Sequence, residues 1–252
     1  MILRNLLCVI LLSVLMAGCR KEETLITGDI TGYVTCISPF YKTYPLEGAA
    51  EVDLMKDSLM IVTQQTGENG QFTFTDVPYG KFFLRPAKPG FVQAWTQEPV
   101  YHAGGGAPTF SNTALYEVPT FQLVYDSMAY SAAYFSQVMF MHFSDPSAAP
   151  DPLTRFYFFA FFSEQPTVDR VSYLAGIKIS GLILEDNADG ETDQIKGYVS
   201  YPGPLFNTLS ENLYVRLYPV AVGQGVYPAE VVPGAFGPPS EVFPFKNPWA
   251  AR

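Results

Sequence analysis

The acidic stretch from residue 185 to residue 193 comes nearest, by residue type and spacing, to a metal site. Calcium takes several oxygen ligands from a compact turn. Four oxygen-bearing side chains have a favourable alternate spacing: Asn187, Asp189, Glu191 and Asp193. However, Lys196 stands where a calcium-binding loop of this spacing requires a closing carboxylate. We therefore expect a solvated hairpin tip of turn-forming residues, with a weak calcium site as the alternative.

The residue types from which catalytic sites are built are scarce. His102 and His142 are the only histidines, and catalytic zinc takes about three protein ligands. The sequence contains neither a Gly-x-Ser-x-Gly nucleophile motif nor a phosphate-binding loop that ends in Gly-Lys-Ser/Thr. We expect no enzymatic activity and no cofactor. A carbohydrate-active hydrolase remains the alternative, because a pair of carboxylates in a cleft cannot be seen in a sequence.

Aromatic side chains offer a different chemistry, the stacking of sugar rings. Trp95 and Trp249, with the many tyrosines, could form such a platform for a glycan. Large aromatic side chains more often fill a core, since each buries roughly 150 to 250 Å². The core role is favoured, and glycan binding stays open.

The overall charge argues against a nucleic-acid partner. The formal net charge is −9 at pH 7, whereas proteins that bind nucleic acids present clustered Lys and Arg to the phosphates. Hydrophobic residues make up 48% of the chain and aromatic residues 15%. This content predicts packed domains rather than a disordered chain.

The first 18 residues have the pattern of a signal peptide. Arg4 supplies positive charge, and an apolar run follows from Leu6 to Met16. This run of about 11 residues fits a signal-peptide core and falls short of the roughly 20 residues that a spanning helix needs. Small residues then precede Cys19, which predicts that residues 1–18 are removed.

The segment Ala17-Gly18-Cys19 resembles the bacterial lipobox, with Met16 where that family usually has Leu. The resemblance implies that Cys19 carries lipid and anchors the chain in a membrane, at about 0.8 kcal/mol per buried methylene. The tether of residues 19–24 also resembles the surface-export signal of some Gram-negative lipoproteins, carried here by Lys21, Glu22 and Glu23. Together they imply an outer-membrane lipoprotein exposed at the cell surface. The alternative for the acidic pair is a merely polar tether.

Cysteine usage leaves no internal disulfide in the mature chain. Cys8 leaves with the signal and Cys19 carries lipid, so only Cys36 remains. Cys36 alternates with Ile30 and Val34, which places it on the buried face of a strand. We predict a core thiol rather than a catalytic one.

Residues 25–91 read as short strands separated by turns, and no segment keeps a helical period. Alternation along 28–37, 50–54 and 80–84 predicts one buried face per strand. In the same register Phe72 and Phe74 point inward. The pattern predicts a small antiparallel β-sandwich.

This module resembles the carboxypeptidase regulatory-like domain, a prealbumin-like β-sandwich. The matching residues are Gly28, Ile30, Gly32, Val34, Pro45, Leu46, Gly48, Ala49, Val52, Thr66, Gly70, Phe72, Phe74, Val77, Pro78, Gly80, Phe82, Leu84, Gly90 and Phe91. Gly67 stands where the family usually has Asp. The resemblance implies a spacer or docking module with no peptidase chemistry.

Residues 92–252 read as a second β-rich module, of immunoglobulin or fibronectin type III style. The Gly-rich segment 101–108 is typical of a linker or loop. The run from Arg155 to Phe162 is apolar on both faces, which predicts a central strand covered on both sides. Residues 130–141 fit either a strand or a short helix.

The sequence therefore predicts an all-β chain of two tandem β-sandwich modules behind a lipoprotein signal peptide. The favoured function is non-enzymatic binding or scaffolding at the cell envelope, on second-module loops such as 145–151 or 185–193. Expected partners are the membrane, through the lipid anchor, and a glycan or an envelope protein. The alternatives are a glycan-binding accessory or carbohydrate-active hydrolase, and a structural adhesin or filament-associated subunit, which a long exposed edge strand would favour.

Overall fold

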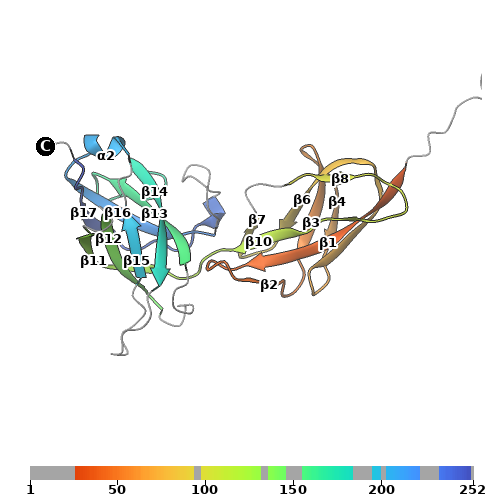
Figure 1. Cartoon of the computed structure of the whole chain (residues 1–252), viewed down its shortest axis with the longest axis horizontal. Coiled ribbons are helices and arrows are strands. Elements are labelled where there is room, and N and C mark those ends of the chain that lie inside the picture. The colour runs from red at the N-terminus through yellow and green to blue at the C-terminus, as the bar shows by residue number, and fades with distance from the viewer. Residues whose placement is uncertain are drawn as a thin grey trace, which may run out of the picture.

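The computed structural model describes residues 26–93, 98–131, 136–145, 155–183, 195–199, 203–221 and 233–250. In this part of the chain, strands dominate and helical structure is limited to α2 (Leu205–Thr208) and η3 (Pro233–Ala235). Figure 1 shows two β-rich lobes joined end to end. The predicted all-β chain with two tandem modules is confirmed. The lipid site Cys19, the tether with Lys21, Glu22 and Glu23, and the acidic loop 185–193 lie outside the described residues.

Two sheets form the first module. The larger has the order β2-β1-β10-β7, with β5 and β9 also paired to β1, and the smaller has the order β4-β3-β6-β8. The strands are β1 (Thr27–Ile37), β2 (Thr43–Pro45), β3 (Glu51–Lys56), β4 (Leu59–Gln65), β5 (Gln71–Pro78), β6 (Gly80–Ala87), β7 (Phe91–Gln93), β8 (Val100–His102), β9 (Thr109–Phe110) and β10 (Thr113–Glu117).

The core of the first module follows from alternation along its strands. Side chains of a strand point to opposite faces at period two, so Ile30, Val34 and Cys36 of β1 enter one cluster with Phe72 and Phe74 of β5. The predicted inward register is confirmed. Cys36 is a free, fully buried cysteine, and burial raises the pKa of its thiol. It is the predicted core thiol.

The first module continues past the boundary expected at residue 91. β10 pairs in parallel with β1, from Val34 opposite Thr113 to Ile37 opposite Tyr116. The segment predicted as a linker begins within β8, which pairs with β6, and the Gly105 N–H donates to the Thr27 carbonyl at 2.8 Å. Glycine-rich composition signals a turn but does not show which strands flank it, so the sequence placed the boundary too early.

A single antiparallel sheet forms the second module, in the order β11-β12-β15-β14-β13-β16-β17. This order differs from the expected immunoglobulin or fibronectin type III arrangement, which divides its strands between two sheets. Residues 130–141 are strand rather than helix, since Tyr130 pairs with Gln137. The strands are β11 (Leu123–Ser131), β12 (Ser136–Phe143), β13 (Arg155–Ser163), β14 (Ala175–Ile183), β15 (Ile195–Val199), β16 (Asn212–Pro219) and β17 (Phe243–Lys246).

β13 is central in this sheet and buried on both faces, as predicted. It pairs with β14 on one side and β16 on the other. Phe156, Phe158 and Phe162 point into the main core, which also holds side chains from β11, β12, β16 and β17. Phe159 and Phe161 point to the opposite face, where η3 and its neighbours cover them. The sheet therefore curls around one aromatic core, which brings its two edges near each other.

An aromatic contact joins the modules. Phe40, in the loop between β1 and β2, stacks on Phe121 with ring centroids 5.2 Å apart. The same ring meets Phe143 and Phe156 edge-on, at 5.9 Å and 6.0 Å. A hairpin tip of the first module therefore packs against the core of the second.

Candidate ligand-binding groove at the sheet seam

A groove of about 710 Å³ lies between the two edge strands of the seven-stranded sheet, β11 and β17. Its volume is within the roughly 300 to 1,000 Å³ usual for small-molecule sites. We call it the seam groove. Its lining residues are Tyr125, Met128, Gln137, Leu209, Ser210, Glu211, Pro244, Lys246, Asn247, Pro248 and Ala250.

Tyr125 bridges the seam. Its ring stacks on Phe243 of β17, with centroids 3.9 Å apart and an interplanar angle of 1°. Burial raises the pKa of the Tyr125 hydroxyl, so this group stays neutral near pH 7 and both donates and accepts hydrogen bonds. The groove therefore has an aromatic wall with a polar tip.

Asn247 holds the opposite wall in place. Its side chain is buried, and its Nδ2 donates to the carbonyls of Phe206 at 2.7 Å and Ser210 at 3.3 Å. Its Oδ1 accepts from the Trp249 N–H at 3.2 Å. One amide thus ties together α2, the segment before β16 and the segment after β17. A buried polar group with these partners fixes the wall before any ligand arrives.

Rings pack behind that wall. Trp249 meets Phe206 edge-on at 6.0 Å and lies 6.4 Å from Phe245. Trp249 was a candidate for a glycan platform, and the structure places it, partly buried, against the main core beside the groove. It supports the groove rather than lining it.

The edge of the seam groove carries one pair of opposite charges. Lys246 Nζ lies 3.1 Å from Glu211 Oε1, and both side chains are largely exposed. An exposed ion pair contributes little to stability, so both groups can exchange this contact for a ligand hydroxyl. Gln137 adds a carboxamide from the β12 side.

The groove can recognise a neutral polar ligand through an aromatic ring, amide and hydroxyl groups, and a balanced ion pair. Glu211 supplies the one carboxylate among the described lining residues, whereas glycoside hydrolysis uses a pair roughly 5 to 9 Å apart.

The two histidines lie elsewhere. His102 is buried in the first module, with Nε2 3.1 Å from the Val77 carbonyl and Nδ1 2.7 Å from Thr109 Oγ1. His142 Nδ1 lies 2.7 Å from Asp126 Oδ1 at the surface of β12 and β11. Within the described ranges, no three His, Cys, Asp or Glu side chains gather as a metal site requires.

Sequence reasoning missed the groove. Loop 185–193, most of loop 145–151 and Trp95 lie outside the described residues, so the structure does not test them. Tyr125, Gln137, Glu211 and Asn247 were not predicted as site residues. They come from distant parts of the chain, and no local pattern links them.

No protein-family model matches this sequence, and a search of the curated proteins also finds no match. The resemblance to the carboxypeptidase regulatory-like domain therefore stands on its residues alone.

Several solved structures show a distant likeness. A DUF3823 family protein from Bacteroides ovatus is 12% identical, with 76% of this chain and 89% of that chain covered and a TM-score of 0.29. One from Bacteroides uniformis is 15% identical, with 88% and 100% covered and a TM-score of 0.27. The major pilin subunit BcpA of Bacillus cereus is 12% identical, with 84% and 67% covered and a TM-score of 0.34. These TM-scores are too low to support an inference about ligand or partner.

Among the described residues, no helix is both long and apolar enough to span a bilayer.

Proposed function

We propose that this chain is a non-enzymatic binding protein of the bacterial cell envelope, anchored by lipid on Cys19, that holds a neutral oligosaccharide in the seam groove. The groove itself carries the proposal, because it combines a ligand-sized volume with an aromatic wall and a polar rim. Sugars present both apolar ring faces and hydroxyl groups, and these two kinds of surface match such a lining.

The charge of the site selects the class of sugar. Glu211 and Lys246 balance each other at the rim, and the chain as a whole carries −9. A polyanionic glycan would meet a repulsive field. Neutral oligosaccharides are therefore the expected ligands.

The position of the groove suits capture away from a membrane. In Figure 1, β1 begins on the side of the first module that faces away from the second module, while β11 and β17 lie at the far end of the second module. A lipid on Cys19 would enter at the first end. The groove would then be displayed at the other, with Lys21, Glu22 and Glu23 directing export to the cell surface.

Calorimetry of the full-length lipidated protein in detergent against a panel of neutral and acidic oligosaccharides tests the binding. The double variant Glu211→Ala/Lys246→Ala removes the rim pair, and we expect it to weaken binding by roughly tenfold or more, because two charge-assisted hydrogen bonds are lost. The matched control, Asp126→Ala/His142→Ala, removes a histidine–carboxylate contact outside the groove and should bind as wild type does. Equal binding by both double variants, or no neutral ligand at all, contradicts the proposal.

The anchor is tested separately by labelling cells with a fatty-acid probe. Wild-type protein should be labelled and Cys19→Ser should not, since only the thiol can form the thioether. Replacing Glu22 and Glu23 by Ala should leave labelling intact and reduce cleavage by external protease. Unlabelled wild-type protein would overturn the lipoprotein assignment. Unchanged cleavage of the variant would show that Glu22 and Glu23 form only a polar tether.

A further inference from the structure

Strand pairing brings several chain segments to one end of the first module. Thr27 at the start of β1 lies opposite Pro78 at the end of β5, and the Tyr79 N–H donates to the Ile26 carbonyl. β6 starts directly after Tyr79 and pairs with β8, so that Lys81 lies opposite Tyr101.

The hairpin between β3 and β4 reaches the same end. Leu59, at the start of β4, lies opposite Lys56, and the neighbouring Met55 pairs with Phe83 near the start of β6. The place where β1 begins, which is also where the tether enters, is therefore surrounded by the turns of both sheets.

Large apolar and aromatic side chains are concentrated at this end. Each has between 51% and 72% of its surface exposed. We call the group the N-terminal rim; it consists of Ile26, Leu59, Met60, Ile61, Tyr79 and Tyr101. Scattered exposed apolar residues are ordinary, but a group of them in one place marks an interaction surface.

Charges of both signs stand among the rim residues. Lys56 and Lys81 contribute cations, and Asp57 and Asp76 contribute carboxylates. A surface with two positive and two negative side chains around apolar and tyrosine side chains suits a zwitterionic headgroup layer. In such a layer, phosphate and choline or ethanolamine lie side by side. Tyrosine is enriched at membrane interfaces for the same reason, an apolar ring with a polar tip.

The length of the tether limits where the rim can lie. Six residues, 20–25, separate Cys19 from Ile26. Fully extended, the seven steps from Cys19 to Ile26 span about 25 Å at most. A lipid on Cys19 thus holds the rim close to the bilayer, whereas the opposite end of the molecule is much farther from it (Figure 1).

We propose that the N-terminal rim docks on the lipid surface, with Leu59, Ile61 and the Tyr79 and Tyr101 rings at the boundary between headgroups and acyl chains. This inference rests on the lipid anchor of the proposed function. Docking would fix the orientation of the first module, and the Phe40 contact with the second module would then direct the seam groove away from the membrane.

Fluorescence quenching on the full lipidated protein in phosphatidylcholine vesicles tests the docking. A polarity-sensitive thiol dye is placed at Leu59→Cys or Tyr101→Cys, and Cys36 does not compete because it is fully buried. Leu205→Cys is the control, since Leu205 is an exposed residue of the second module. We expect doxyl-labelled lipid to quench the dye at 59 and 101 at least about threefold more than at 205, and aqueous iodide to show the reverse. Added phosphatidylglycerol should change little, because the rim carries both signs of charge.

Each outcome separates the two proposals. If the protein does not pellet with vesicles, the anchor fails, and the proposed function fails with it. If it pellets while the dye at 59 and 101 is quenched only by iodide, the docking alone is overturned. A dye shielded from both quenchers in a concentration-dependent way would indicate that a second copy covers the rim, and would also overturn the docking.

Discussion

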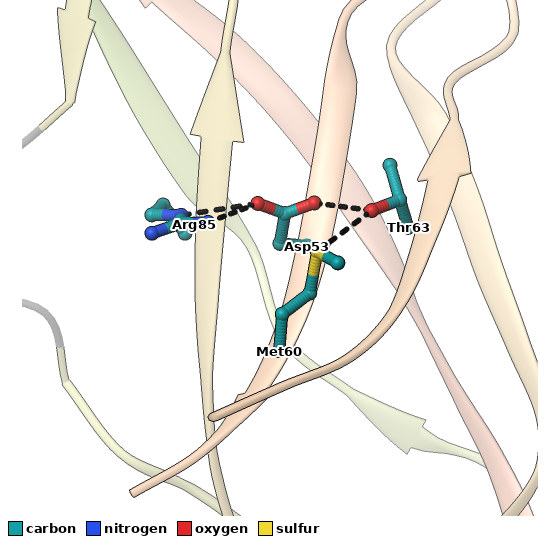
Figure 2. A network of polar contacts seen from close by, with 4 residues as sticks. All are labelled: Asp53, Met60, Thr63 and Arg85. Carbon is teal, nitrogen blue, oxygen red and sulfur yellow. Dashed lines mark hydrogen bonds and ion pairs between the residues drawn. The ribbon is translucent and has the colours of Figure 1, made fainter. Parts of the chain in front are cut away.

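Asp53 shows how a single partly buried carboxylate connects three strands of the smaller sheet. Arg85 of β6 donates to Asp53 Oδ2 through Nε at 3.0 Å and Nη2 at 2.6 Å. On the other side, the Thr63 hydroxyl of β4 donates to Oδ1 at 2.5 Å and lies 3.2 Å from the Met60 sulfur. Figure 2 shows the carboxylate between its two partners. Edge strand β4 is exposed along its length. The Thr63 hydrogen bond holds this strand to Asp53 of β3.

The Asp53 network predicts a pH-dependent stability. Partial burial opposes ionisation, but the hydrogen bonds from Thr63 and Arg85 and the Arg85 charge outweigh it and lower the pKa of Asp53. A lowered folded-state pKa gives stability that is present above the unfolded pKa, about 3.9, and is lost as the pH falls through the folded value. We expect Asp53→Asn to lower the free energy of unfolding by about 1 to 2 kcal/mol at pH 7.

Urea denaturation across the acid range checks this prediction. The difference between wild type and Asp53→Asn should shrink as the pH drops below about 4. Glu68→Gln, an exposed carboxyl in the turn after β4, serves as control and should have no effect at pH 7. A difference that stays constant down to acid pH would mean that the charge of Asp53 plays no part.

At the scale of the element, β13 packs large rings on both faces because its neighbours leave room for them. A Cβ added to Gly197 of β15 would lie 2.8 Å from the Phe158 ring and 3.0 Å from the Met141 methyl. Gly181 of β14 leaves similar space for Phe156, where a Cβ would lie 2.7 Å from the ring. The dense aromatic strand and its glycine-bearing neighbours therefore form one packing unit.

Gly197→Ala should destabilise the fold by about 1 to 3 kcal/mol, the usual cost of overpacking a core. Phe158→Leu should relieve the clash, so the double variant should lose less stability than the two single variants added together. Chemical denaturation of all four proteins measures this coupling. Gly106→Ala is the control, since nothing lies within 4 Å of its added Cβ. Strict additivity would show that the ring and the glycine do not share the space.

At the scale of the whole molecule, the Phe40 contact decides whether the modules behave as one body. The Phe40 ring lies among Phe121, Phe143 and Phe156 of the second module, and Tyr41 meets Tyr157 edge-on at 5.5 Å. Burial raises the pKa of the Tyr41 hydroxyl. This aromatic junction would hold the two modules in a fixed arrangement. The N-terminal rim and the seam groove would then stay at opposite ends of the molecule.

Phe40→Ser should uncouple the two modules. We expect a loss of about 2 to 4 kcal/mol, because a ring packed on three others is replaced by a small polar group. Differential scanning calorimetry should then show two transitions where wild type shows one. Phe110→Ser removes an exposed phenylalanine of the first module and should leave the single transition unchanged. Two transitions already present in wild type would contradict a coupled pair of modules.

The sequence by itself determined the features that depend on local pattern. Period-two alternation places Ile30, Val34 and Cys36 inside, because successive side chains of a strand must point to opposite faces. The unbroken apolar run of β13 indicated a central strand for the same reason. The signal peptide and lipidation of Cys19 are likewise predictions from local sequence.

Only the tertiary structure decided what depends on contacts between distant residues. The seam groove forms because the sheet curls until β11 and β17 approach, which brings Tyr125 to Phe243 across more than a hundred residues. The N-terminal rim arises because the ends of six strands, β1, β3, β4, β5, β6 and β8, meet at one end of the first module. The module boundary lies later than predicted because β10 pairs with β1. Such pairings are selected by the burial of whole sheet faces against each other, and alternation within one strand does not specify which partner supplies the opposite face.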